Sequence, residues 1–411
     1  MRGVVAGTLL GLVMGLPCLA QDKLAPPPLE RYLRWGPLRA RPGVGLSNLG
    51  YDSNILLGTG DRVVGDYTAT FSPRVDGLVL LGDTAFLTFR EQFDYTAYAS
   101  NSDQSYYDNR LSAQLTVPFR RFGLIPDGKL NRIRERPVDL DDIRPIRHER
   151  GAGVALVARP GWRTEVELRG GQMDYEYSDP DSAIADSGIA RLSRDEESLA
   201  LRVAYQAIGS TRILFDGLRK RIDFDEPEIV DGVPVARNTD ERRTMVGFEF
   251  VRGGPLAGTI LAGWDDIDAL DPSLADLSEV VGEAHLVYRL NGRTRLEIDA
   301  VRLPGFSTFT TESYYLNSEI GVRPVYYFSR LWGFEGMLRR GWLEFPTSSS
   351  TIPREDDLLR YEVGVRLRVM ENSIGRRVEY AFRVGRYRRD SNLDQLDREQ
   401  STVGFAVIAG F

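Results

Sequence analysis

Arginine side chains recur with a two-residue period in three segments between positions 331 and 390. A two-residue period places side chains on one face of a β-strand. That face carries six arginines against three glutamates, an excess of three positive charges, and a planar guanidinium binds carboxylate and phosphate through paired hydrogen bonds. The arginines, which are candidate substrate contacts, are Arg339, Arg360, Arg366, Arg368, Arg377 and Arg383, and the glutamates are Glu335, Glu362 and Glu379.

A second face, between positions 256 and 302, is acidic. It carries four carboxylates against Arg289 and Arg295, an excess of two negative charges. The further candidate contacts on this face are Glu283, Glu297 and Asp299, which share it with Asp265.

The chain offers little material for catalysis or for a metal site. It contains two histidines, His148 and His285, and one cysteine, Cys18. His285 shares the face of Glu283, and His148 lies at a predicted loop edge, so we interpret both as ordinary polar residues rather than partners of a nucleophilic serine. A formal charge of −7 also disfavours nucleic acid, which is bound by basic surfaces. We therefore expect no enzyme activity, no cofactor, no metal and no nucleic-acid partner.

The first twenty residues have the layout of a secretory signal peptide. Arg2 precedes an apolar run over residues 4–16, and the small residue Ala20 marks the expected cleavage site. Removing 20 of 411 residues leaves 391 without a cysteine, so hydrogen bonds and burial must hold the fold in place of disulfides. Residues 21–38, with prolines at 26–28, are predicted to form an extended periplasmic leader. Residues 39–411 are predicted to form one domain.

The elements that position these side chains are predicted to be strands. From residue 39 to the end, segments of about 10 to 16 residues alternate apolar and polar side chains. In one segment Leu199, Leu201, Val203 and Tyr205 oppose Ala200, Arg202 and Ala204. We find no convincing helical stretch.

Short turns and longer polar connections alternate along the whole chain, so the two kinds are predicted to lie at opposite ends of the strands. Seventeen strands are clear by alternation, and an even count requires one more between Phe122 and His148. The sequence Pro126-Asp127-Gly128 is typical of a hairpin turn and would be followed by a charged strand over residues 129–136. The expected count is eighteen, or sixteen if a strand is irregular.

The fold class that follows is all-β: a transmembrane antiparallel up-and-down β-barrel with about eighteen strands. Lipid cannot hydrogen-bond an exposed backbone, so membrane strands must close into a sheet without edges. Trp332 and Trp342 share a face, and ten residues at roughly 3.3 Å, tilted roughly 40°, separate them by about 25 Å along the membrane normal, as two aromatic girdles require. The last strand ends in Phe411, which resembles the signal read by the barrel-assembly machinery.

The leader and the first strand carry a family resemblance. Residues 32–38 read Tyr-Leu-Arg-Trp-Gly-Pro-Leu, and residues 50–54 read Gly-Tyr-Asp-Ser-Asn. This pattern resembles the start of the putative β-barrel porin type 2 family, many members of which are associated with exopolysaccharide or capsule synthesis genes. The resemblance implies an outer-membrane barrel of a Gram-negative-type bacterium. Tyr51, Asp52 and Asn54 either form a strand end with an Asx turn or contact a ligand.

Three functions remain open from the sequence. The first is a porin-like passage that could serve exopolysaccharide export, in which the basic and acidic arcs oppose each other across an open lumen and set up a transverse field. The second is a non-conducting surface or scaffold barrel of a polysaccharide export machine, with the charges paired along a closed wall. The third, a membrane hydrolase, is disfavoured because neither histidine is placed to activate a serine. Expected partners are outer-membrane lipid and lipopolysaccharide, the barrel-assembly machinery through Phe411, and polysaccharide export components.

Overall fold

The structure is a computed structural model, and it describes residues 22–82, 84–135, 144–178, 189–230, 233–251, 254–308, 313–345, 353–371 and 377–410. The predicted signal peptide, including Cys18, and the terminal Phe411 lie outside the described residues. Among the helices of the described part, none is long and apolar enough to cross a membrane.

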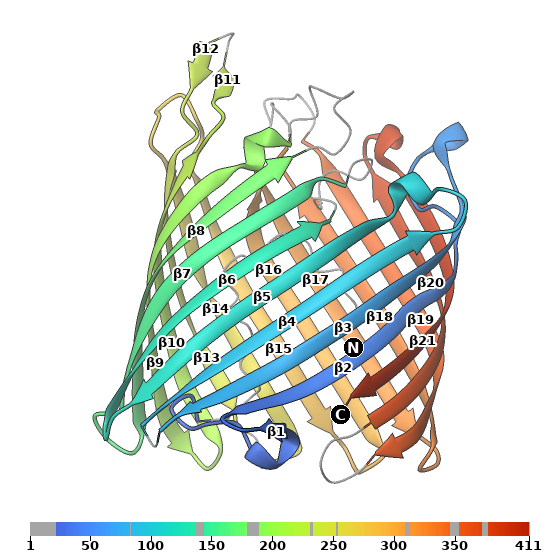
Figure 1. Cartoon of the computed structure of the whole chain (residues 1–411). Helices are drawn as coiled ribbons and strands as arrows, with labels where there is room; N and C mark the ends of the chain where they lie inside the picture. Colours follow the sequence, from blue (N-terminus) through green and yellow to red (C-terminus); the bar gives the residue numbers. More distant parts are fainter. Residues whose placement is uncertain are drawn as a thin grey trace.

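Antiparallel strands close into a single barrel (Figure 1). The sheet of the described residues has 19 strands, of which the short strand β1 pairs only with β2. The remaining eighteen form the wall. Strand β2 closes the wall by pairing with β21, in a ladder that runs from the pair Gly43 and Gly410 to the pair Asp52 and Thr402. The predicted count of eighteen is therefore confirmed. Closure satisfies the backbone hydrogen bonds that lipid cannot satisfy.

The wall strands are long, as the predicted alternation requires. They are β2 Leu38–Asp52, β3 Asp66–Leu81, β4 Ala85–Tyr98, β5 Tyr106–Pro118, β6 Phe122–Arg134, β7 Ile146–Ala158, β8 Thr164–Ser178, β9 Arg194–Ile208, β10 Thr211–Phe224, β13 Thr239–Phe250, β14 Leu256–Ala269, β15 Leu277–Arg289, β16 Thr294–Phe306, β17 Tyr314–Tyr327, β18 Trp332–Glu344, β19 Glu355–Glu371, β20 Arg377–Ser391 and β21 Arg398–Gly410. The shorter elements are β1 Leu33–Trp35, β11 Glu228–Val230, β12 Val233–Val235 and the 3-10 turns η1 Leu29–Arg31, η2 Gly60–Arg62, η3 Ser102–Gln104, η4 Ala190–Leu192 and η5 Asp394–Leu396.

The two kinds of connection lie at opposite ends of the barrel, as predicted. Strand β8 runs from the short turn at residues 159–163 to the long connection that starts after Ser178. The leader and the end of β21 lie at the short-turn end, which is the periplasmic end of such a barrel. At the other end the hairpin of β11 and β12 rises above the rim (Figure 1).

Side chains alternate between an apolar outer face and a mixed inner face. Leu199, Leu201 and Tyr205 are exposed on the outside of β9, while Ala204 between them is buried inside. Val403 on β21 is likewise exposed. The predicted Asx turn is also present, because the Asp52 carboxylate accepts the Asn54 N–H at 2.9 Å.

The predicted hairpin at Pro126 is wrong. Residues 126–128 lie inside β6, and the turn before that strand is at residues 119–121, where Phe119 N–H donates to the Phe122 carbonyl at 2.7 Å. Lys129 pairs with Ser112 on β5 and Gly151 on β7, so the extra strand exists but starts earlier. Pro126 is tolerated because the β5–β6 ladder is interrupted there, between the pairs of Asp127 and Leu124.

The external ends of β16 and β17 leave the wall and turn into the lumen. The β15–β16 ladder ends at Gly282 and Arg302, although β16 continues to Phe306. The Phe306 ring lies 5.0 Å from the ring of Phe224 at the end of β10, four strands away and therefore about 19 Å along the wall. Phe306 also packs against the buried cluster of Tyr175, Tyr177, Ile189 and Leu192. These contacts require the strand end to fold over the interior.

Gly258 on β14 is a position where we expect only glycine to assemble. Its φ is 142°, and a Cβ there would lie 2.0 Å from the His285 carbonyl oxygen on β15. Gly258→Val should therefore disrupt the β14–β15 ladder and reduce the fraction of folded barrel, measured by its shifted migration in SDS gels without boiling. Gly170→Val on β8 is the matched control, since a Cβ there has no neighbour within 4 Å. Equal folding of the two variants would contradict the expectation.

Candidate functional site

One cavity of about 1590 Å³ occupies the lumen. Its lining includes Pro27 and Tyr32 from the leader at the periplasmic end, and Leu57 and Arg144 from the connections at the external end. Between these ends the lining residues come from β2 to β9 and from β17 to β21. The cavity therefore reaches both ends of the barrel but follows one side of it, away from the strands that the inward end of β16 covers.

The structure brings four of the six predicted arginines to this cavity: Arg339, Arg360, Arg366 and Arg383. Arg368 also belongs to the inner face, but its guanidinium donates to the Tyr327 hydroxyl at 2.6 Å and lies 4.3 Å from that ring. The side chain of Arg377 lies outside the described part of the structure.

The acidic candidates face inward on β15 and β16. The Asp299 carboxylate contacts His285 Nδ1 at 2.5 Å, and Glu297 contacts Arg295 and Arg323, the latter at 3.3 Å. Glu283 on β15 is half-buried opposite Leu261 of β14. Only β17 separates their strands from the basic strands β18 to β20, so the expectation that the two arcs oppose each other across the lumen is wrong. The sequence could have shown this, because in an up-and-down barrel only residues 303–330 lie between the acidic and the basic face.

Most of the lining arginines have a carboxylate partner. Glu335 accepts from Arg366 and from Arg383, whose Nε lies 2.6 Å from Glu335 Oε1. Arg366 Nη1 also lies 2.7 Å from Glu379 Oε1, and Arg383 Nε lies 3.4 Å from Glu362 Oε1. Arg339 lies 3.2 Å from Glu319. These pairs rigidify the wall and leave little unbalanced charge at their positions.

The sequence interpretation missed a second polar wall, on β3 to β8. Arg110 on β5 lies 2.7 Å from Asp94 and 3.1 Å from Asp108, and Arg169 on β8 lies 2.6 Å from Asp127 on β6. All of these residues line the cavity. The same two-residue period that marked the basic face was present here, and could have found them.

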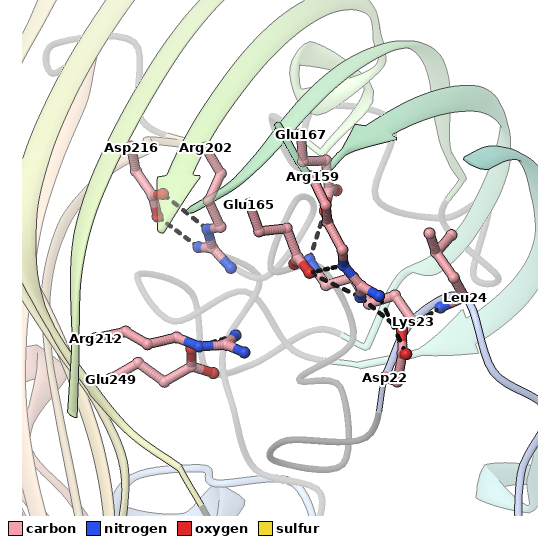
Figure 2. Close-up of polar contacts among 10 residues, drawn as sticks. All are labelled: Asp22, Lys23, Leu24, Arg159, Glu165, Glu167, Arg202, Arg212, Asp216 and Glu249. Carbon is pink, nitrogen blue, oxygen red and sulfur yellow. Dashed lines mark hydrogen bonds and ion pairs between the residues drawn. The ribbon is translucent and has the colours of Figure 1, made fainter. Parts of the chain in front are cut away.

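The leader enters the periplasmic mouth (Figure 2). Arg159 in the β7–β8 turn holds the Asp22 carboxylate through two hydrogen bonds of 2.6 and 3.1 Å, and Lys23 pairs with Glu167 on β8. Leu24 packs on the inner apolar cluster that contains Ile125. The hydrogen bond from Arg159 lowers the pKa of the Asp22 carboxyl below its usual value. The attachment is therefore fully stable at neutral pH, and it is lost as the pH falls through this lowered pKa.

A closed eighteen-stranded barrel with an apolar outside and a polar cavity that reaches both ends has the architecture of an outer-membrane porin. A sequence model described as putative beta-barrel porin 2 matches residues 40–410. The chain therefore belongs to this family, as the leader and first strand indicated. Porins of this kind lie in the outer membrane of Gram-negative bacteria, which is the location of this chain.

Several solved structures are similar to this chain at low sequence identity. A BenF-like porin from Pseudomonas fluorescens Pf-5 superposes with a TM-score of 0.52 at 11% identity, covering 91% of this chain and 98% of that one. OccAB3 from Acinetobacter baumannii superposes with a TM-score of 0.49 at 11% identity, covering 90% and 99%. OpdK from Pseudomonas aeruginosa gives 0.46 at 11% identity, covering 90% and 98%. No curated protein matches the chain in sequence.

Proposed function

We propose that this barrel is an open aqueous passage for polar solutes across the outer membrane. The observation that carries the proposal is the lumen cavity, whose lining runs from Tyr32 at the periplasmic end to Arg144 at the external end. Barrels of this strand number are wide enough to hold an aqueous channel. A polar wall of paired charges keeps such a channel hydrated, whereas a scaffold barrel has no need of a cavity that reaches both ends.

The substrate contacts in this proposal are the inward arginines, with the carboxylates that hold them in place. An exported polysaccharide is the substrate that we propose. Its hydroxyls can hydrogen-bond the charged side chains of the wall, its acidic groups can bind the arginines, and its sugar rings can pack on the tyrosine rings. Tyr98, Tyr106 and Tyr387 line the same cavity and offer ring faces for sugar contact. The association of many members of the resembled family with exopolysaccharide or capsule synthesis genes also supports this substrate.

Planar-bilayer recording of the full chain tests the passage. We expect stepwise single-channel currents in potassium chloride, and brief interruptions of the current when a short soluble polyuronate is added to one side. A silent bilayer, with the chain shown to be inserted and folded, would favour the scaffold barrel. Open currents without interruptions would keep the passage and remove the polysaccharide.

A further inference from the structure

Arg360 differs from the other basic residues that line the passage on β18 to β20. It lies in the external half of β19 and lines the cavity. In the described part of the chain, no carboxylate oxygen lies within 4.0 Å of its guanidinium, whereas Arg339, Arg366 and Arg383 each have such a partner.

The neighbours of Arg360 explain why it has no carboxylate partner. Directly opposite it on β18 is Arg339, whose guanidinium binds Glu319. Two residues along β19 on the same face is Glu362, which contacts Arg383. On its other side, β20 places Tyr387 opposite Arg360, and Tyr387 also lines the cavity. Glu319 and Glu362 are thus already engaged by other arginines.

Such an arrangement is unfavourable without a ligand. Like charges directly opposite each other in a sheet destabilise it, and a part-buried guanidinium without a counterion loses hydration without gaining a partner. An anion between β18 and β20 would offset both costs, because the fork of Arg360 can donate two hydrogen bonds to one carboxylate or phosphate group.

We propose that Arg360, flanked by Arg339 and Tyr387, is an anion-binding subsite of the passage, at which a carboxylate or phosphate group of the solute pauses during transit. The proposal rests on the proposed function for its role in transport, since a subsite acts on flux only if the lumen conducts. It selects one position from the predicted basic face, and the remaining arginines of that face serve as wall-forming pairs.

The test uses the full chain in detergent and in bilayers, with inorganic phosphate and acetate as separate probes. Arg360→Gln removes the charge, Arg360→Lys keeps the charge but not the fork, and Arg386→Gln is the matched control. Arg386 lies on the same wall but on the outer face, where it pairs with Glu399 at 2.9 Å. Phosphate binding is measured from the broadening of its phosphorus NMR signal, acetate binding from its carbon signal, and ion preference from the reversal potential in a salt gradient.

We expect Arg360→Gln to weaken binding about tenfold, the change that the loss of one charged hydrogen-bonding group produces. Its reversal potential should also shift toward cations. Arg360→Lys should retain the reversal potential but bind less tightly than the original chain, and Arg386→Gln should behave like the original chain. A preference for phosphate over acetate, or the reverse, identifies the group that the subsite takes.

Binding and reversal potential that are unchanged in Arg360→Gln would overturn the subsite while leaving the passage intact. Binding that depends on Arg360 in a barrel that carries no current would overturn the passage and the transport role, and would leave only an anion site in a closed lumen. If Arg360→Gln does not fold, the comparison of Arg360→Lys with the original chain still decides whether the guanidinium fork binds the probes.

Discussion

Replacing Leu201 by arginine will strongly reduce the fraction of molecules that fold into a barrel. Leu201 lies at the middle of β9 on the lipid-facing side, opposite Leu168 of β8 and Gly217 of β10. An arginine at the bilayer midplane costs about 2 to 4 kcal/mol, which lowers the ratio of folded to unfolded chain roughly 30- to 700-fold. The measurement is the fraction that folds into lipid vesicles across a urea series, followed by the gel shift of unboiled samples.

The matched control is Ser198→Arg on the same strand. Ser198 faces the interior and lines the cavity, so a new arginine there stays in water beside other polar groups. We expect this variant to fold within about 1 kcal/mol of the original chain. A similar loss of folding for both variants would mean that the assigned faces of β9 are wrong.

Much of the architecture could be predicted from the sequence because strand faces depend on local alternation. The two-residue period of β9 predicts that Leu199 is exposed and that Ala204 is buried, as observed. A shift of the strand by one residue would move every side chain of β9 to the opposite face, so the period fixes which side chains face outward. The prediction of a turn at Pro126 was wrong for a related reason. Leu124 and Leu130 continue the apolar outer face through the Pro-Asp-Gly sequence, so lipid-facing burial outweighed the local turn preference.

The candidate site was predicted in its residue types but not in its charges. Parity placed Arg360 and Arg383 on the inner face correctly. However, whether an arginine is paired depends on which residue the register brings opposite it, and Arg383 meets Glu335, which is 48 positions away. A register shift between Arg368 and Met370 moves the β19–β20 ladder by one residue, and no sequence pattern predicts this shift. The unpaired state of Arg360 therefore could be seen only in the structure.

Removing the ring of Phe306 should widen the passage. Its contacts across the lumen include the Phe224 ring, the cluster of Tyr175, and the guanidinium of Arg194 at 5.2 Å, and together they hold the end of β16 over the lumen. The β15–β16 ladder does not hold this end, since it stops at Arg302. Phe306→Ala removes up to about 3 kcal/mol of packing, which should release the strand end and uncover the side of the lumen below it. We expect a larger single-channel conductance.

A second measurement separates widening from general loosening. Leu214 on β10 is buried on the inner face beneath this region, and the chain has no cysteine other than Cys18. Leu214→Cys should react with a charged thiol reagent much faster in the Phe306→Ala background than alone. Phe248→Ala, which removes a ring from the lipid-facing side of β13, should change neither the conductance nor the labelling rate. If Phe306→Ala leaves both unchanged, another contact holds the strand end. The Phe306 ring can have this effect because β16 has no ladder with β15 beyond Arg302, although it still pairs with β17 as far as Phe306 and Tyr314. Side-chain contacts therefore fix where the paired ends of β16 and β17 lie over the lumen.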